Sequence, residues 1–324
     1  MSWPKAAAKP AAMILPDPTR PLKIGTRGSP LALAQAQEVR GRLCAAFDLP
    51  EAAFAITVIA TTGDRVQDRS LKDLGGKGLF TREIEEALEA GSIDIAVHSM
   101  KDMPTLQPAG LALDCFLPRE DVRDAFVARL HAGIADLPPG ATVGSSSLRR
   151  RAQLLRRRPD LVVVEFRGNV QTRLRKLDQG VAAATFLAMA GLNRLGLAGQ
   201  VPAHPIDPAD LLPAVAQGAI GVERRDGDSA TAALLEAIHH GPTGQRLAAE
   251  RAFLRMLDGS CQTPIAGLAE LDGGRLRLRG EILRPDGSEA LADDASAPVE
   301  DGARLGAEMA RALLSRAGPG FFAG

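Results

Sequence analysis

The sequence predicts an α/β protein made of two successive βαβ units and a small α+β domain. Over residues 22–99, short apolar segments alternate with helical patterns in the order βαβαβ, which implies a parallel sheet with right-handed crossovers. A second observation is that strand, hydroxyl-rich helix start and arginine recur in that order after residue 142. The third is a change of pattern after residue 243, where a helix, a strand pair and a final helix follow.

Composition sets the class of protein. The 324 residues are 45% hydrophobic, enough for two or three domains with a sizeable core. Lys plus Arg and Asp plus Glu both number 39, so any basic character must be local. Three scattered cysteines favour a reducing cytoplasm over a disulfide framework. Residues 1–21 are rich in Ala and Pro without a signal-peptide pattern, and no apolar window reaches membrane-span length, so we expect a disordered tail and no membrane partner.

The first unit opens with a predicted strand at Leu22–Gly25 that breaks at a glycine-bearing turn. Ser29 and Pro30 then suit the N-cap and first position of a helix to about Leu43. A turn that leads into a helix N-terminus can bind an anion, which makes Arg27 and Ser29 candidate ligands. Capping alone explains Ser29 equally well.

A long polar connection follows the second predicted strand, at residues 54–61. Residues 62–78 lack a helical or strand pattern, and loops of this length are usually functional lids or disordered. The run Gly75-Gly76-Lys77-Gly78 adds hinge-like freedom at its end. We therefore predict a lid that carries Lys77, before a helix over 79–90.

The third strand of this unit delivers a polar tip. Residues 93–98 are mostly apolar, and Ser99, Lys101 and Asp102 follow before the chain stops at Pro104. Ligands of open α/β sheets bind outside the carboxyl ends of the strands. These three side chains are therefore candidates for chemistry.

The second unit begins after a junction near 118–122. Its predicted strands cover 125–128, 142–144, 161–166 and 182–188, and its predicted helices cover 145–157, 170–179 and 189–196. Residues 211–222 then resemble a segment that crosses back to the first unit. The third domain has a predicted helix over 243–257, strands at 267–271 and 276–283, and a helix over 304–315.

A basic cluster marks the second unit. Ten Lys or Arg residues but only two acids lie between Arg149 and Lys176. Arg149, Arg150, Arg167 and Arg173 fall at strand ends and helix starts, where side chains converge on the crevice. Arginine forks match carboxylates, so the cluster predicts a ligand with many carboxylates. Single-stranded nucleic acid is disfavoured because the chain has one Trp and no Tyr to stack on bases.

Cys261 lies in a Gly-Ser-Cys-Gln-Thr-Pro turn, a setting typical of an exposed thiol. A lone cysteine is more often an inert small hydrophobe, and Cys44 and Cys115 suit that interpretation better. The five histidines show neither the motif of a Cys-His nucleophile pair nor metal-ligand spacing, so no metal site is predicted.

Several motifs in this order resemble the porphobilinogen deaminase, or hydroxymethylbilane synthase, family, from about residue 22 to the C-terminus. They are Thr26-Arg27-Gly28-Ser29-Pro30-Leu31-Ala32, Gly75-Gly76-Lys77-Gly78-Leu79-Phe80, Ala96-Val97-His98-Ser99-Met100-Lys101-Asp102, Ser146-Ser147-Leu148-Arg149-Arg150, Leu192 to Gly196, and Gly259-Ser260-Cys261-Gln262.

The resemblance implies a transferase of haem and tetrapyrrole biosynthesis that joins four porphobilinogens head to tail with loss of ammonia. It also implies a covalent dipyrromethane cofactor, held by a thioether. We expect a monomer, because the sequence shows no coiled coil or extended apolar stripe. The implied fold has two periplasmic-binding-protein-like lobes with parallel-rich sheets and crossover strands, plus a small α+β C-terminal domain. We assign lobe 1 to 22–118 plus 216–239, lobe 2 to 119–215, and domain 3 to 240–324.

Residue roles follow from the same resemblance. Asp102 matches the catalytic carboxylate and Cys261 the cofactor attachment. The positions that match cofactor binding are Ser99, Lys101, Ser146, Ser147, Arg149, Arg150, Gly168, Asn169 and Arg173. Those that match substrate binding are Arg27, Ser29, Arg167, Arg194 and Gln217. Phe80 matches a stacking aromatic, and Lys77 belongs to the lid.

Two positions depart from the family pattern. Ala183 stands where an acid is common, and Ala216 replaces the first glycine of Val-Gly-Gln-Gly, which we expect to stiffen the crossover between lobes. An alternative function is a non-catalytic two-lobed protein that binds an organic polyanion. It would need neither Asp102 beside a lid lysine nor a loop cysteine.

Overall fold

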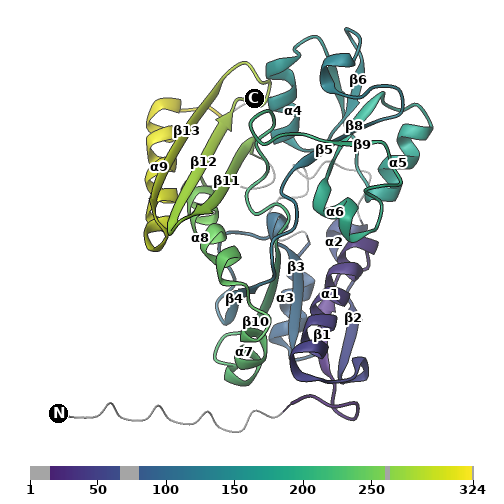
Figure 1. Cartoon of the computed structure of the whole chain (residues 1–324), viewed down its shortest axis with the longest axis vertical. Helices are drawn as coiled ribbons and strands as arrows, with labels where there is room; N and C mark the ends of the chain where they lie inside the picture. Colours follow the sequence, from purple (N-terminus) through teal and green to yellow (C-terminus); the bar gives the residue numbers. More distant parts are fainter. Residues whose placement is uncertain (1–14, 66–79, 260–262, 323–324) are drawn as a thin grey trace, which may run out of the picture.

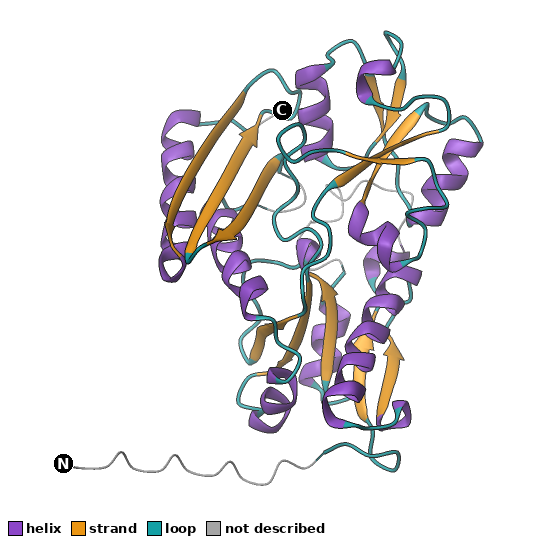
Figure 2. Ribbon diagram, in the orientation of Figure 1, coloured by secondary structure: helices purple, strands orange, loops and turns teal. Residues whose placement is uncertain are grey.

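The computed structural model of the chain describes residues 15–65, 80–259 and 263–322. Among these residues, three sheets form the centres of three bodies, and helices pack against each sheet (Figures 1 and 2). The prediction of two α/β lobes with crossover strands and a third, smaller α+β domain is confirmed. The residue boundaries that we assigned to the three parts stay a proposal.

The sheet of lobe 1 has the strand order β2-β1-β3-β10-β4. Strands β1, β2 and β3 are mutually parallel, as predicted, but β10 runs antiparallel to both β3 and β4. The sheet is therefore parallel-rich, as predicted, and its antiparallel strand β10 is the segment that crosses back from the other lobe. The elements of this lobe are β1 (Leu22–Thr26), α1 (Pro30–Phe47), η1 (Glu51–Ala53), β2 (Phe54–Val58), α2 (Thr62–Arg65), α3 (Arg82–Glu89), β3 (Ile95–Ser99), η2 (Met100–Asp102), β4 (Leu111–Phe116), β10 (Ile220–Arg225) and α7 (Ser229–Glu236).

Lobe 2 repeats this arrangement with the strand order β7-β6-β8-β5-β9. Strands β6, β7 and β8 are parallel, and β5 is antiparallel to β8 and β9. The elements are β5 (Asp124–Ala128), η3 (Ile134–Asp136), β6 (Thr142–Gly144), α4 (Leu148–Arg157), β7 (Val162–Val164), α5 (Val170–Asp178), β8 (Ala184–Ala188), α6 (Met189–Arg194) and β9 (Ala203–Pro205).

Domain 3 is a three-stranded antiparallel sheet of order β11-β12-β13, with α8 and α9 packed on it. Phe253 of α8 and Met309 of α9 are buried in its core. Met100, Met103 and Phe116 of lobe 1 belong to the same core, so domain 3 and lobe 1 share buried apolar surface. The elements are α8 (Gly241–Met256), β11 (Ile265–Asp272), β12 (Arg275–Leu283), β13 (Ala290–Pro298), η4 (Val299–Asp301) and α9 (Gly302–Ala317).

Some elements escaped prediction for physical reasons. Strand β13 alternates exposed and half-buried residues and contains Asp293 and Asp294, so its sequence lacks the β-branched character of a typical strand. Of the predicted lid, only 62–65 are described, as α2, and the rest with Lys77 lies outside the described residues. Residues 1–14 of the predicted tail also lie outside them, and residues 17–20 form a turn.

The crossover into β10 contains unusual backbone conformations. Ala216 has a φ of 61°, in the left-handed region that costs a residue with a Cβ about 1–2 kcal/mol. Gly218 has a φ of 87°, and a Cβ there would lie 2.6 Å from the carbonyl oxygen of Glu120. The departure from glycine at position 216 therefore places a methyl group where the backbone favours glycine. The other departure, Ala183, is exposed beside β8.

Candidate active site

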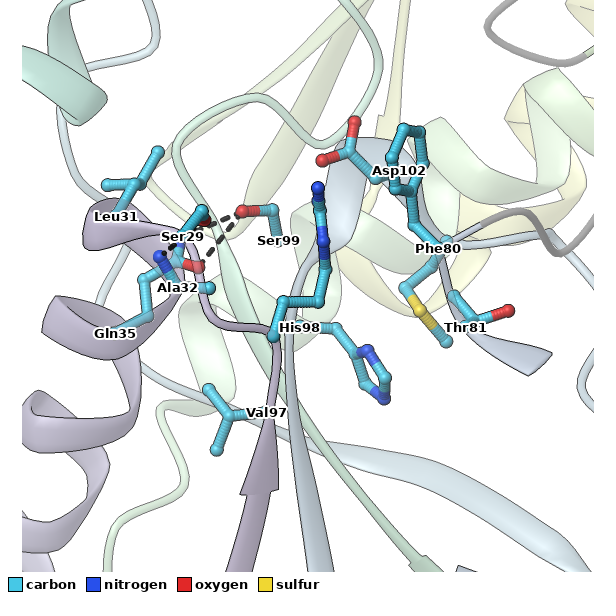
Figure 3. Close-up of a pocket in the computed structure, with 12 residues that line it drawn as sticks. Ser29, Leu31, Ala32, Gln35, Phe80, Thr81, Val97, His98, Ser99 and Asp102 are labelled. Carbon is cyan, nitrogen blue, oxygen red and sulfur yellow. Dashed lines mark hydrogen bonds between the residues drawn. The ribbon is translucent and has the colours of Figure 1, made fainter. Parts of the chain in front are cut away.

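A pocket lies at the carboxyl ends of β1 and β3, where ligands of α/β sheets are expected. Figure 3 shows Ser29, Gln35 and Ser99 together on one side of it, with Asp102 and Phe80 on the other. The residues that line it are Arg27, Ser29, Leu31, Ala32, Gln35, Phe80, Thr81, Val97, His98, Ser99, Asp102 and Met103. The structure therefore brings together five predicted site residues from three separate segments.

Ser29 and Ser99 both make hydrogen bonds within lobe 1. Ser29 is the N-cap of α1, and its hydroxyl accepts from the amide of Ala32 at 3.3 Å. The Gln35 side-chain nitrogen donates to Ser99 Oγ at 2.8 Å, and the Gln35 oxygen accepts from the same hydroxyl at 3.0 Å. Gln35 thus fixes the end of β3 to α1. The sequence prediction missed it because a glutamine inside a helix has no distinctive pattern.

Asp102 ends the short η2 helix and is exposed to the cleft. Near it, the guanidinium carbon of Arg27 lies 4.1 Å from the centre of the Phe80 ring, a cation–π contact. Asp102 is therefore accessible to a ligand and lies on the same side of the pocket as the Phe80 ring (Figure 3).

Lys101 is half-buried between the lobes. Burial lowers the pKa of its ammonium to about 8, against the opposing influence of the Asp102 carboxylate, and the nearby Arg150 lowers it further. Lys101 on lobe 1 thus lies within electrostatic reach of arginines on lobe 2. It is still mostly protonated at pH 7 and loses its charge as the pH rises through 8.

Arg149 and Arg150 share a buried counter-ion, Asp124. The Nη2 atoms of Arg149 and Arg150 lie 2.8 and 2.6 Å from the two Asp124 oxygens, and Gln217 donates to the same carboxylate at 3.0 Å. Both arginines are almost fully buried, and Arg150 also donates to the carbonyl oxygen of Phe186. The predicted cofactor arginines and Gln217 are therefore held in place by a residue that the sequence prediction missed. In the sequence, Asp124 was noticeable only as an acidic residue just after the junction predicted near 118–122.

Asp124→Asn is expected to lower the free energy of unfolding by about 3–5 kcal/mol at pH 7, because two buried guanidiniums lose their carboxylate. Burial raises the pKa of Asp124, but Arg149 and Arg150 outweigh burial and hold it well below its usual range. This stabilisation is complete above the unfolded pKa of about 3.9 and is lost as the pH falls through the folded pKa. Urea unfolding should show the difference between wild type and variant shrinking below pH 4.

The control for this variant is Asp160→Asn, which removes an exposed partner of Arg158 and should leave the midpoint almost unchanged. A stability difference for Asp124→Asn that stays constant from pH 7 to pH 3 would contradict the ion-pair explanation.

The remaining predicted site residues of lobe 2 lie at the N-termini of two helices beside the cleft. Ser147 caps α4 by accepting from the amide of Arg150, and Ser146 Oγ accepts from the amide of Phe166. Asn169 caps α5, and Gly168, with a φ of 115°, precedes it. These residues place two helix N-termini, and hence partial positive charge, at the same edge as the arginines.

Arg173 extends this positive region towards lobe 1. Its Nε donates to the carbonyl oxygen of Gly168 at 3.0 Å. Burial and then Arg150 lower its pKa to about 10, whereas Glu165 and Asp102 act in the opposite direction and Arg167 adds to the lowering. Asp102 is therefore close enough to influence Arg173 from the opposite lobe.

Arg194 of α6 links the two lobes instead of facing open solvent. Its Nε lies 3.2 Å from Oε2 of Glu38 on α1, and its Nη2 donates to the carbonyl oxygen of Gly218 at 3.1 Å. Its side chain is 8% exposed. In this conformation the Arg194 guanidinium already has a carboxylate partner from lobe 1.

The two other cysteines occupy unreactive settings, whereas Cys261 lies outside the described residues. Cys115 is buried, and burial raises the pKa of its thiol to about 12, aided by Asp114. Burial also raises the pKa of Cys44, with a further contribution from Glu51. Neither thiol is a good source of thiolate at neutral pH.

Comparison with known proteins identifies two matching family models. The model described as "Porphobilinogen deaminase, dipyromethane cofactor binding domain" matches residues 22–233, and "Porphobilinogen deaminase, C-terminal domain" matches residues 245–315. The porphobilinogen deaminase of Paracoccus denitrificans (strain Pd 1222) is 67% identical over 308 residues, which cover 95% of this chain and 98% of that protein.

Solved structures with a distant likeness include periplasmic binding proteins. The aliphatic sulphonate binding protein SsuA of Escherichia coli is 17% identical with a TM-score of 0.40, over 72% of this chain and 69% of that chain. An ABC-transporter periplasmic substrate-binding protein of Coxiella burnetii is 15% identical with a TM-score of 0.40, over 71% and 96%. The assignment of the fold rests on the strand orders given above.

Proposed function

This chain belongs to the porphobilinogen deaminase family, and from that membership we propose that it joins four porphobilinogens head to tail, with loss of ammonia at each step. The product is the linear tetrapyrrole hydroxymethylbilane, in tetrapyrrole (haem) biosynthesis, and the enzyme is a transferase. The alternative of a non-catalytic polyanion-binding protein is set aside because the identity to the Paracoccus enzyme extends over 95% of the chain.

The observation that carries this proposal is an excess of positive charge opposite Asp102. Lys101, Arg173 and the charged side chains that interact electrostatically with either of them form one group. This group contains more cations than carboxylates. The cations are Lys101, Arg149, Arg150, Arg167 and Arg173, and the carboxylates are Asp102, Asp124 and Glu165. A ligand with several carboxylates neutralises such an excess.

The family's dipyrromethane cofactor fits this set of donors. It is built from two porphobilinogens, and each contributes an acetate and a propionate. When bound, it supplies the pyrrole end to which further porphobilinogens are joined. Lysine and arginine side chains and the capped starts of α4 and α5 suit its carboxylates. We assign cofactor binding to Ser99, Lys101, Ser146, Ser147, Arg149, Arg150, Gly168, Asn169 and Arg173, and thioether attachment to Cys261.

Substrate binding is proposed at the pocket of lobe 1 and at the interlobe contact. Arg27 and Phe80 form one wall of that pocket, and Ser29 lies at the start of α1. Arg194 would exchange its Glu38 partner for a substrate carboxylate, which has the same charge and oxygen geometry. The proposed substrate residues are Arg27, Ser29, Arg167, Arg194 and Gln217, with Phe80 stacking and Lys77 in the lid.

Asp102 is proposed as the catalytic carboxylate. Positive charge develops on the substrate as the amine departs, and a fixed carboxylate stabilises that charge and holds pyrrole N–H groups. The carboxylate also assists proton transfer to the leaving amine. Its exposure to the pocket makes these contacts accessible to a substrate.

The proposed cellular setting follows from the helices, the cysteines and the arginines. The helices in the described part of the chain are all too short or too polar to cross a bilayer. We propose a cytoplasmic monomer that binds neither nucleic acid nor membrane, because its cysteines lack a disulfide pattern and its arginines face a cleft.

The test uses the purified full chain and porphobilinogen. We expect consumption of porphobilinogen with one ammonia released per molecule, and a protein mass that exceeds the polypeptide mass by one dipyrromethane. An acid aldehyde reagent should also colour the protein. A protein of bare polypeptide mass that releases no ammonia would overturn the proposal.

A further inference from the structure

Arg251, on α8 of domain 3, contacts the chain just after Asp102. Its Nη2 donates to the carbonyl oxygen of Pro104 at 2.9 Å and to Oε1 of Gln107 at 3.1 Å. Gln107 Nε2 in turn donates to the same Pro104 oxygen at 2.9 Å. One guanidinium therefore joins both ends of the segment 104–107 to a helix from a different domain.

The other side of the Asp102 turn is also attached to domain 3. Met100 and Met103 flank Lys101 and Asp102, are 1% and 4% exposed, and pack in the same core as Phe253 of α8. The Met103 amide closes the turn on the Met100 carbonyl oxygen at 3.3 Å. Because the two methionines point into the core, Lys101 and Asp102 project towards the cleft.

From these contacts we propose that Arg251 is a positioning residue for Asp102. It holds the 104–107 segment, and through it the catalytic turn, at a fixed place on α8. The inference rests on the proposed function of Asp102 and adds a residue that neither contacts the pocket nor belongs to the family motifs quoted above. Since α8 ends at Met256 and Cys261 follows in sequence, one helix precedes the cofactor attachment and supports the catalytic carboxylate.

The chemistry of the contact favours arginine. In the described part of the chain, the acceptors recorded for Arg251 are a carbonyl and an amide oxygen, and no carboxylate pairs with it. Burial lowers the pKa of Arg251 to about 10, while Glu223 acts in the opposite direction, so the group remains charged at pH 7. Charged donors make stronger hydrogen bonds than neutral ones, and the planar fork directs them. A lysine would keep the charge but lose the fork.

The structure offers a matched control on the same helix. Arg255 lies one turn further along α8 and is exposed, so Arg255→Met removes the same charge without touching the 104–107 segment. Gln107→Ala removes one of the two acceptors and leaves Arg251 in place. Together with Arg251→Met and Arg251→Lys, these variants distinguish the loss of the hydrogen bonds to the 104–107 segment from the loss of a positive charge on α8.

The experiment measures kcat, KM and intact mass for each cofactor-loaded enzyme, well below its unfolding temperature. We expect Arg251→Met to lose about 10- to 100-fold in kcat with KM within about threefold, because a misplaced catalytic group costs turnover. Arg251→Lys and Gln107→Ala should lose less, and Arg255→Met should match wild type. A purely structural role would lower the melting temperature and leave kcat of the folded, loaded enzyme unchanged.

Each outcome bears on one claim. Wild-type enzyme without porphobilinogen turnover would overturn the proposed function itself. Active wild type with full kcat in loaded Arg251→Met would overturn only the positioning role. If Arg251→Met does not fold, Gln107→Ala and Arg251→Lys decide: reduced kcat at unchanged KM supports the role, and wild-type kcat in both overturns it.

Discussion

Asp102→Ala is expected to lower kcat by about 10²–10³-fold, because it removes the carboxylate that faces developing positive charge in the cleft. Asp102→Asn should lose nearly as much, since the amide keeps the shape but not the charge. Steady-state assays of cofactor-loaded protein, with the cofactor verified by intact mass, measure the effect.

Both variants should remain folded. Asp102 is exposed at the end of η2, and surface substitutions usually change the free energy of unfolding by no more than about 0.5 kcal/mol. Asp114→Asn serves as the control and should retain wild-type kcat. Asp114 does not line the pocket and pairs instead with Arg224. Near-normal turnover in Asp102→Ala would refute the role given to this carboxylate.

Cys261→Ala is expected to abolish activity, because the cofactor has no thiol to which it can attach. Intact mass spectrometry should find the bare polypeptide mass for this variant. Cys44→Ala and Cys115→Ala should carry the full cofactor mass, since burial raises the pKa of both thiols and thereby suppresses the nucleophilic thiolate.

Two results would contradict the assignment of cofactor attachment to Cys261. A Cys261→Ala protein that still gains one dipyrromethane would place the attachment elsewhere. Loss of the added mass in Cys115→Ala, with the protein folded, would point to that thiol instead.

Local signals in the sequence predicted much of each lobe. Ser29 marked the start of α1 correctly, because an N-cap residue acts on the amides that follow it directly. The serine run 145–147 predicted a helix start at 145, and α4 begins at Leu148 with Ser147 as its N-cap. The parallel strands β1 and β3 were recognisable from apolar runs that end at polar residues. Strand β10 was predicted only as a crossover segment, since its antiparallel pairing depends on residues far away in sequence.

In the candidate site, too, local features could be predicted from the sequence, whereas contacts between distant residues could not. Arg149 and Arg150 could be placed at a helix start near the cleft, but their shared partner Asp124 could not be predicted. That pairing depends on how β5 lies against α4. The hydrogen bond between Gln35 and Ser99 likewise joins a helix to a strand across the lobe. The family resemblance implied the roles of the site residues. Their hydrogen-bond and ion-pair partners, such as Asp124 and Gln35, could be identified only from the three-dimensional structure.

The position of β10 has a consequence for synthesis on the ribosome. All five strands of the lobe 2 sheet lie within residues 124–205, whereas the lobe 1 sheet needs residues 220–225 between β3 and β4. Chains emerge from the N-terminus, and pairing across a long loop is slow. The lobe that is translated second therefore has its complete sheet available first. Until β10 arrives, β3 and β4 lack the strand that joins them, and nascent lobe 1 has exposed edges that invite association with chaperones.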